Sequence, residues 1–157
     1  MEAVIYSKIG NLKIVEIEDR LTELRFINQP VTRLPNSKIL VEVKAQLEEY
    51  FTRTRTRFDL PLNPSGTDFQ KKVWQELVTI PYGETISYQE MAHRLGDPKC
   101  IRAAAKANGQ NPIAIVIPCH WVIGAHGEMT GYAGGIHRKE ELLALEGAAV
   151  MNQLNLF

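Results

Sequence analysis

The sequence predicts an α+β fold, with a small antiparallel sheet and one helix in the N-terminal part and a helical domain after it. Two observations lead to this fold class. Short β-branched stretches fill the first 30 residues, whereas helical spacing of apolar residues dominates from residue 68 onward. A cluster of turn-forming residues separates the two parts at 60–67. We therefore expect two domains, at residues 1–62 and 63–157.

Composition and charge indicate a compact globular chain rather than a disordered or fibrous one. The 157 residues are 45% hydrophobic, and 18 Lys and Arg balance 18 Asp and Glu. A chain of this length buries about 70% of its unfolded surface, so it needs no disulfide framework. The two cysteines favour a reducing, intracellular compartment. Since the longest apolar run, 113–117, cannot span a bilayer and acidic residues interrupt residues 1–20, we expect a cytoplasmic protein with no membrane partner.

The first half is predicted to hold three antiparallel strands, one helix and an exposed strand. Short β-branched stretches at 3–7, 12–17 and 21–27 are separated by polar turns, as is typical of hairpins. Apolar residues recur at helical spacing over 38–51. The alternating Arg and Thr of 53–57 predict an edge strand. Three arginines on one face could contact phosphate, but charge on an edge strand more often protects it from aggregation.

Three helices are predicted in the second half. The first covers 68–78 and has one apolar face. The second covers 87–95, with Ser87 as N-cap and Glu90 three residues later, which is the spacing of a capping box. The third runs over 98–107 to an Asn-Gly pair that can end a helix. The short Gly-containing turn between the second and third helices is typical of helix-turn-helix domains.

The third helix is unusually small and locally basic. It carries four alanines, so its backbone could approach another surface closely. Between residues 91 and 127 the basic residues are Arg94, Lys99, Arg102 and Lys106, against one acid, Asp97. This pattern fits either a solvated helix that packs on its own domain or a helix that contacts DNA. Net charge zero therefore does not exclude a nucleic-acid partner, because the positive charge is local.

Cys119 is the candidate nucleophile. It follows an apolar run between Pro112 and Pro118, which predicts a buried strand that ends at the cysteine, and His120 comes next. The thiolate is the reactive form of cysteine, and a nearby base supported by a carboxylate would increase the thiolate fraction at neutral pH. The residues alone leave two interpretations open, a buried structural cysteine and a nucleophile held on a rigid element.

The residues around Cys119 resemble one known family in order and spacing. The chain carries Pro-Cys-His-Trp-Val-Ile-Gly at 118–124, Thr-Gly-Tyr-Ala-Gly-Gly at 130–135, Arg-Lys at 138–139, Leu-Leu-Ala-Leu-Glu-Gly at 142–147, Ile-Pro-Tyr-Gly-Glu-Thr at 80–85, Ser-Tyr at 87–88, Arg102 and Asn-Pro at 111–112. This set is similar to the O6-alkylguanine-DNA alkyltransferases, also called methylated-DNA–protein-cysteine methyltransferases. The resemblance implies a ribonuclease-H-like N-terminal domain and a C-terminal domain with a winged helix-turn-helix.

The resemblance implies DNA repair by a single, stoichiometric alkyl transfer. Cys119 would accept a methyl or other alkyl group from O6 of guanine, or from O4 of thymine, with no cofactor and no metal. His120 would act as its base through a water, Glu146 would orient the His120 ring, and Asn111 would hold the loop behind the cysteine. Tyr88 would help to protonate the departing base. Because the thioether has no leaving group, each molecule would act once.

The resemblance also implies a monomer that binds double-stranded DNA containing O6-alkylguanine through the minor groove and flips the damaged base out of the duplex. The residues expected to contact that base are Tyr88, Val122, Tyr132, Ala133 and Gly134, together with the backbone carbonyl of Cys119. The residues expected to contact the rest of the DNA are Arg102, Lys99, Lys106 and Ala103. Arg102 would fill the space of the flipped nucleotide, and the small alanines would let the helix enter the groove.

Two departures from the family pattern bear on these expectations. The family usually has Arg after Cys-His, whereas this chain has Trp121, which removes a charge and a fork of donors. Some members bind zinc in the N-terminal domain through Cys and His, and this chain has neither before His93, so no zinc is expected there. The alternative function is a non-catalytic alkyltransferase-like binder of alkylated guanine, a class that typically replaces the cysteine retained here. An unrelated cysteine hydrolase would leave the flanking motifs unexplained.

Overall fold

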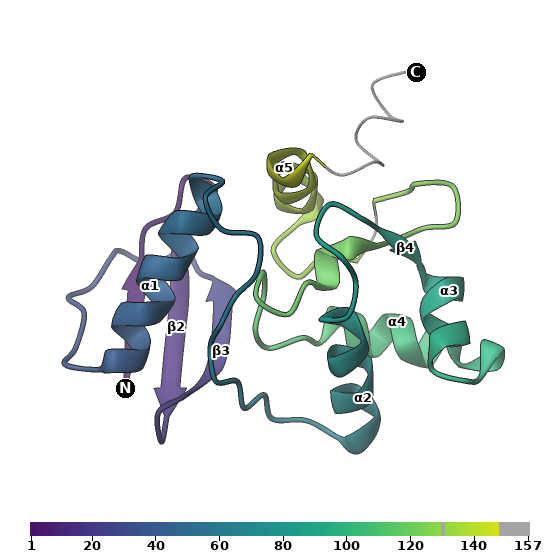
Figure 1. The fold of residues 1–157 in the computed structure, drawn as a ribbon, viewed down its shortest axis with the longest axis horizontal. Coiled ribbons are helices and arrows are strands. Elements are labelled where there is room, and N and C mark those ends of the chain that lie inside the picture. Colours follow the sequence, from purple (N-terminus) through teal and green to yellow (C-terminus); the bar gives the residue numbers. More distant parts are fainter. Residues whose placement is uncertain (130, 148–157) are drawn as a thin grey trace. The chain divides into compact units, whose positions relative to one another are not determined.

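The computed structural model describes residues 1–129 and 131–147, which form two compact units (Figure 1). Among the described residues, the first unit comprises residues 1–65 and 112–116, and the second comprises residues 66–111, 117–129 and 131–147. The predicted α+β class is confirmed, with a three-stranded antiparallel sheet in the first unit and mainly helices in the second. No helix in the described part of the chain is long and apolar enough to cross a membrane. The boundary between residues 62 and 63 stays a prediction.

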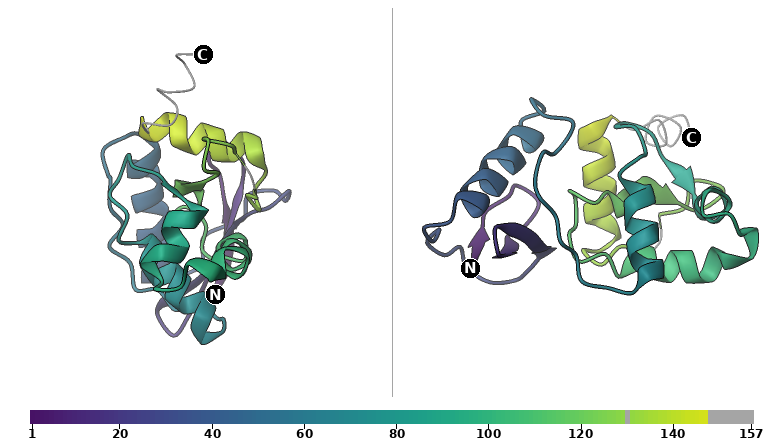
Figure 2. Two further views of the ribbon diagram at one scale, coloured as in Figure 1. Left: turned by 90° about the vertical axis from the view of Figure 1, so that its right-hand side faces the viewer. Right: turned by 60° about the horizontal axis from the view of Figure 1, so that its bottom comes forward.

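The first unit is a hairpin sheet covered by one helix. β1 (Glu2–Ile5), β2 (Leu12–Ile17) and β3 (Arg20–Phe26) pair antiparallel in that order, and α1 (Lys38–Phe51) packs on the sheet (Figure 2). α1 buries apolar residues at helical spacing, because that stripe faces the strands. They are Leu40, Val43, Leu47 and Tyr50. The three predicted strands and the helix are thus confirmed, with small differences only at the ends of β1 and β3.

The predicted strand at 53–57 is wrong. The residues after α1 form turns, in which Arg53 adopts a left-handed φ of 66°. The backbone N–H and the hydroxyl of Thr54 both donate to the Glu49 carbonyl, at 2.9 and 3.1 Å. These bonds satisfy a carbonyl near the end of the helix that has no partner within the helix, and they reverse the direction of the chain. The alternation of Arg and Thr therefore belongs to a helix end rather than to a pleated strand.

The predicted buried strand before Cys119 is also wrong. Residues 112–116 belong to the first unit, where the N–H and C=O of Leu24 on β3 hold them with bonds of 2.9 and 2.8 Å. The pairing amounts to one isolated parallel bridge, between Leu24 and Ile113. Ile115 adopts a left-handed φ of 70°, which is rare for a β-branched residue and interrupts any regular ladder. The apolar run thus reflects burial without regular secondary structure.

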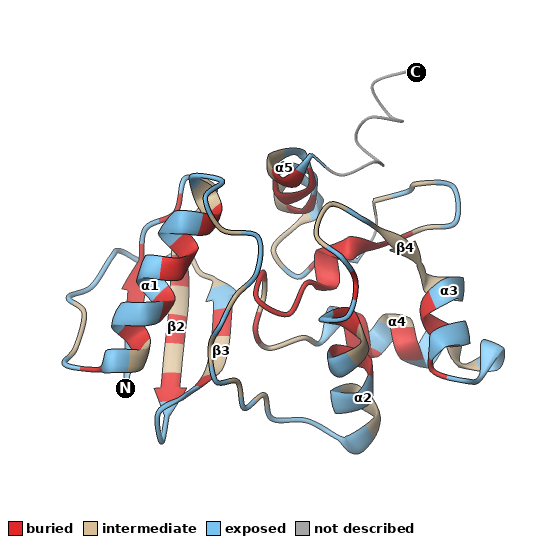
Figure 3. Cartoon of the chain, viewed as in Figure 1, coloured by how far each residue is buried: buried red, intermediate tan, exposed pale blue. Residues whose placement is uncertain are grey.

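The second unit contains short helices and two very short strands. Its elements are α2 (Asp68–Leu77), β4 (Ile86–Ser87), α3 (Tyr88–Arg94), a 3₁₀ turn (Pro98–Cys100), α4 (Ile101–Gly109), a second 3₁₀ turn (Cys119–Trp121), β5 (Val122–Ile123) and α5 (Ile136–Glu146). β4 and β5 pair in parallel, a contact that two residues in each strand do not signal in the sequence. Each helix turns a buried side inward, and these sides form the core (Figure 3).

α3 and α4 form the predicted helix-turn-helix pair. The Ser87 hydroxyl accepts from the Glu90 N–H at 3.0 Å, so the predicted N-cap of α3 is confirmed, while the Glu90 carboxylate pairs with Arg94. Gly96 makes the turn with a φ of 89°, a conformation that favours glycine. The predicted third helix begins as a 3₁₀ turn, and α4 continues through Gly109, past the start of the Asn-Gly pair predicted to end it.

Candidate active site

Cys119 lies at the start of a 3₁₀ turn in the second unit and is buried, with only 7% of its surface exposed. Burial raises the pKa of the Cys119 thiol, whereas a hydrogen bond with the Asn111 side chain and the positive charge of Lys139 act in the opposite direction. A donor and a cation favour the thiolate over the thiol. Burial outweighs both effects, so the Cys119 thiol needs a base to remove its proton, while the amide and the lysine lower the cost of the charged form.

Two asparagines near the C-terminal end of α4 hold the backbone around Cys119. Asn111 donates its side-chain amide to the Ile117 carbonyl at 2.7 Å, and Asn108 donates to the Cys119 carbonyl at 3.2 Å. The predicted site residue Asn111 therefore lies beside Cys119. The sequence assigns Asn108 only to a helix end, and its contact becomes evident because α4 buries it.

His120 and Glu146 form a buried pair. Nε2 of His120 lies 2.9 and 3.1 Å from the two carboxylate oxygens of Glu146, and the side chains are 0% and 1% exposed. A neutral imidazole that donates from Nε2 keeps Nδ1 as an acceptor. Nδ1 is buried and has no hydrogen-bond partner among the described protein atoms. The ring can therefore take a proton at Nδ1 while the carboxylate holds its other side.

Trp121 contacts the same carboxylate. Its indole N–H donates to Oε1 of Glu146 at 2.8 Å. Its ring packs edge-on against Tyr82, with centroids 6.3 Å apart, and against His120, at 5.6 Å. At the position where the family usually has arginine, this chain therefore has a single neutral donor, which contacts the Glu146 carboxylate.

Lys139 is a site residue that sequence reasoning missed. Its side chain is fully buried, and Nζ donates to the Val122 carbonyl at 2.6 Å. Burial lowers the pKa of Lys139 to about 8. The spacing of residues along α5 could have identified it from the sequence. Lys139 and Glu146 share one face of α5 with two leucines, at positions i, i+3, i+4 and i+7, and that face is buried.

Tyr88 lies where α3 approaches the glycine-rich segment 131–135. It is the first residue of α3 and is half-buried. A Cβ placed on Gly131 would be in ordinary van der Waals contact with the Tyr88 hydroxyl oxygen, 3.7 Å away, so the two segments lie close together. The left-handed φ of 63° at residue 131 favours glycine there. Nζ of Lys139 lies 6.0 Å from the centre of the Tyr88 ring. Tyr88 therefore lies near Lys139 and the 131–135 segment, and its predicted role toward the base stays a prediction.

The predicted base-contacting loop is divided between buried and exposed residues. Tyr132 is buried, and burial raises the pKa of its hydroxyl well above the usual value. Ala133 is exposed, and Gly134 is half-buried, with its carbonyl accepting from Arg138 at 3.3 Å. Thr130, the first residue of this motif in the sequence, lies outside the described residues. The loop thus presents a small exposed residue next to a buried aromatic one.

The four predicted DNA contacts lie on the exposed side of α4 and of the turn before it. Lys99, Arg102, Ala103 and Lys106 are all exposed, whereas two other alanines of α4 are buried. Their spacing of three and four residues places them along one helix face. Arg94, which the sequence groups with these basic residues, instead forms ion pairs with two glutamates at 3.3 and 3.7 Å.

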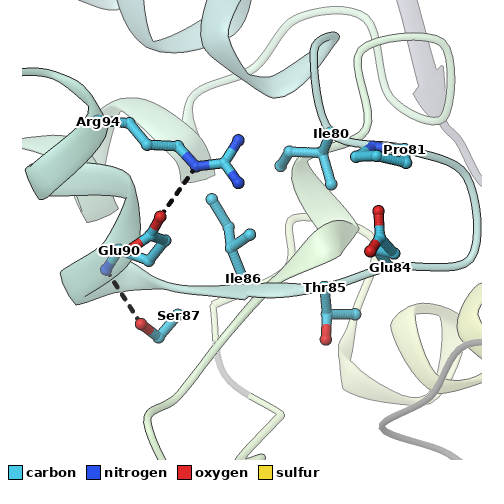
Figure 4. A pocket seen from close by; sticks show the side chains of 8 residues that line it. All are labelled: Ile80, Pro81, Glu84, Thr85, Ile86, Ser87, Glu90 and Arg94. Carbon is cyan, nitrogen blue, oxygen red and sulfur yellow. Dashed lines mark hydrogen bonds and ion pairs between the residues drawn. The ribbon is translucent and has the colours of Figure 1, made fainter.

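A pocket of about 360 Å³ lies between the segment after α2 and the beginning of α3 (Figure 4). Its lining residues are Ile80, Pro81, Glu84, Thr85, Ile86, Ser87, Glu90 and Arg94. None of the residues predicted to accept the alkyl group or to contact the base lines it. The single cation of this pocket, Arg94, is turned toward Glu90, so the pocket offers no obvious anion site.

The helix-turn-helix pair is typical of DNA-binding proteins, and the buried Cys119 beside His120 and Glu146 is the candidate nucleophile of this one. Residues 68–148 match the profile of the 6-O-methylguanine DNA methyltransferase DNA binding domain, and residues 1–64 match that of the ribonuclease-like domain of the same proteins. The chain belongs to the 6-O-methylguanine DNA methyltransferase family. The resemblance noted around Cys119 is thereby confirmed.

Individual relatives match over nearly their whole length. The methylated-DNA–protein-cysteine methyltransferase of Mycobacterium leprae is 46% identical over 156 residues, which cover 96% of this chain and 94% of that protein. The protein of the same name from Methanosarcina barkeri is 48% identical over 149 residues, covering 91% and 94%. Among solved structures, Mycobacterium tuberculosis OGT in complex with DNA matches with a TM-score of 0.84 and 46% identity, covering 96% of this chain and 97% of that one.

Proposed function

We propose that this chain repairs DNA by transferring a methyl or other alkyl group from O6 of guanine to the sulfur of Cys119, once per molecule. The observation that carries this proposal is the placement of Cys119 next to the buried pair of His120 and Glu146, in a chain of the methyltransferase family. The relative from M. tuberculosis that was crystallised with DNA supports DNA as the partner. A protein that only binds alkylated guanine would have no need of a thiol supported by an amide and a lysine.

The transfer begins at the thiol. Nδ1 of His120 takes the Cys119 proton through a bridging water, and Glu146 stabilises the imidazolium that forms. The thiolate attacks the alkyl carbon, so that an S–C bond forms while the C–O6 bond breaks and its electron pair stays on guanine. Tyr88 donates toward N3 of the departing base, and the net reaction moves one proton from the thiol to guanine. The thioether has no leaving group that water can displace, so the protein is consumed.

The flipped base is held mainly by backbone groups. The carbonyls of Cys119 and Val122 accept from the exocyclic amine, and the N–H of Ala133 faces O6. The Val122 carbonyl already accepts from a lysine, but a carbonyl oxygen has two lone pairs and can accept from both donors. Tyr132 and Gly134 form the wall of the base pocket.

α4 carries the contacts to the duplex. Arg102 enters the base stack from the minor groove, in the space of the flipped nucleotide, while Ala103 lets the helix approach closely. Lys99 and Lys106 contact phosphates. The exposure of all four residues supports these roles. Because Arg94 is held in ion pairs, the phosphate contacts are few, and we expect binding to depend only shallowly on salt concentration.

We assign the protein to the cytoplasm, where it acts as a monomer. Both cysteines, Cys100 and Cys119, are free thiols. The acceptor thiol must stay reduced until it meets a lesion, and a reducing compartment provides this condition.

The test of the transfer is the intact mass of the protein after incubation with a duplex that contains one O6-methylguanine. We expect the mass to rise by one methyl group, and peptide mapping to place it on the Cys119 peptide. The same duplex with unmodified guanine serves as the control and should leave the mass unchanged. Tight binding of the methylated duplex with no change in mass would instead establish the non-catalytic binder.

Replacing Lys139 by methionine is expected to slow the transfer at neutral pH by about tenfold, the change in thiolate that one pKa unit produces. The substitution keeps an unbranched apolar stem, one atom shorter than lysine, but removes the charge that favours the Cys119 thiolate, so the pKa of the thiol should rise further. In the unmodified protein this support is present below pH 8 and is lost as the pH rises through about 8, the pKa of Lys139. The rate of thiol alkylation by iodoacetamide across pH measures the effect, and identical profiles for both proteins would contradict it.

A further inference from the structure

We propose that Trp121 is a positioning residue of the transfer reaction, which holds the Glu146 carboxylate so that Glu146 in turn orients His120. This inference rests on the proposed function, because it concerns the same acceptor site. It assigns a purpose to the residue at which this chain departs most clearly from the family pattern.

The geometry around Glu146 carries the inference. The indole N–H of Trp121 donates to Oε1 at 2.8 Å, and Nε2 of His120 lies 2.9 Å from Oε2. Oε1 thus lies closest to the indole N–H and Oε2 closest to Nε2 of His120, which is also 3.1 Å from Oε1. The two donors are neighbours in one 3₁₀ turn. A carboxylate bound at both oxygens has little freedom to rotate, and a fixed carboxylate fixes the plane of the imidazole it bonds. The Glu146 side chain is 1% exposed, so water cannot easily replace either donor.

The charge of the donor distinguishes this arrangement from one with arginine. A guanidinium would hold the carboxylate equally well, but its permanent positive charge would offset the charge of Glu146. The neutral indole N–H holds the carboxylate without offsetting it. The full charge of Glu146 therefore acts on His120 when the imidazole takes the thiol proton.

Packing holds the indole itself in place. Tyr82 packs against the Trp121 ring at an interplanar angle of 85°, and Trp121 is 8% exposed. A buried tryptophan could also act merely as filler of the core, in which case its N–H would be incidental. The experiment must therefore remove the N–H while keeping the packing.

The decisive variant replaces Trp121 by benzothienylalanine, in which sulfur takes the place of the indole N–H at nearly the same shape. Single-turnover kinetics with an O6-methylguanine duplex give the first-order transfer rate and the affinity separately. We expect the rate to fall by about tenfold, as for loss of a hydrogen bond to a charged group, and the affinity to change by less than about twofold. Trp121→Phe, which also removes packing, should lower the rate at least as much.

Trp74 provides the matched control. It is also buried, at 2% exposed, and its indole N–H donates to the Ala107 carbonyl at 2.9 Å rather than to Glu146. The same benzothienylalanine replacement at Trp74 removes a comparable hydrogen bond. It should leave the first-order rate of reaction with a free alkylated guanine base unchanged, whereas the replacement at Trp121 should lower that rate too. Equal rates for the two replaced proteins would overturn the inference.

A double-variant cycle with Glu146→Ala tests whether Trp121 acts through the carboxylate. If it does, removing the indole N–H should cost less than about twofold once Glu146 is absent, because the two changes interrupt the same contact. An undiminished tenfold loss in the Glu146→Ala protein would contradict the inference. The proposed function is judged separately, since it fails only if the unmodified protein gains no alkyl group on Cys119.

Discussion

Replacing Cys119 by alanine is expected to abolish alkyl transfer completely, while affinity for a methylated duplex stays within about twofold of that of the unmodified protein. The sulfur forms the new bond, so no neighbouring group can replace it. The substitution removes one atom from a buried position, and the contacts proposed to bind the base use the backbone of Cys119 rather than its side chain. Transfer of a labelled methyl group and anisotropy of a labelled duplex measure the two properties in one protein.

Cys100→Ala is the control for this experiment. Cys100 is the other cysteine of the chain, lies in the 3₁₀ turn before α4, and is a free thiol. The Cys100→Ala protein should transfer the methyl group at the rate of the unmodified protein. A labelled methyl group on the Cys119→Ala protein would show that another residue accepts it, and the assignment of Cys119 would be wrong.

Arg102→Ala is expected to slow transfer from duplex DNA by about 100-fold, because holding a base outside the stack costs a few kcal/mol. The same variant should react with a free alkylated guanine base at nearly the normal rate, since no base has to leave a stack. Arg102 is exposed on α4, so its removal leaves no cavity and should not lower the melting temperature. The two rates are measured side by side under single-turnover conditions.

Lys106→Ala separates a stacking role from simple charge. Lys106 is exposed on the same helix as Arg102, and we assign it to a phosphate. Its loss should weaken duplex binding only severalfold, and the effect should fade at high salt. Equal losses for Arg102→Ala on duplex and free base, or a loss no larger than that of Lys106→Ala, would refute the stacking role.

Helices and strands whose apolar residues recur at regular spacing are predictable from this sequence. Segments whose path depends on an unusual φ at one residue are not. α1 occupies the predicted residues 38–51 because apolar residues recur at helical spacing throughout it. The segments 53–57 and 112–116 have the composition of strands, but Arg53 and Ile115 each adopt a positive φ that composition does not reveal. The residue type makes that conformation unfavourable, so only the surrounding structure can impose it.

The candidate site likewise contains residues that the sequence identifies and a contact that it does not reveal. Cys119, His120 and Asn111 are adjacent to one another or nearly so in the sequence, and the motif identifies them directly. The contact of Trp121 with Glu146 spans 25 residues and depends on how α5 packs, so the sequence gives no sign of it. The predicted roles of these residues remain to be tested by the variants above.

Residues 112–116 belong to the first unit although they follow most of the second unit in the sequence, and this affects folding during translation. The N–H of Leu24 on β3 donates to the Pro112 carbonyl and its C=O accepts from the Ala114 N–H, whereas Leu21 of the same strand bonds with Pro61 and Asn63. During synthesis residues 61–63 can pair with β3 at Leu21 before α2 is made, but the backbone of Leu24 stays without its partners while α2, α3 and α4 emerge. The order of translation thus makes residues 112–116 the last part of the N-terminal unit to be synthesised.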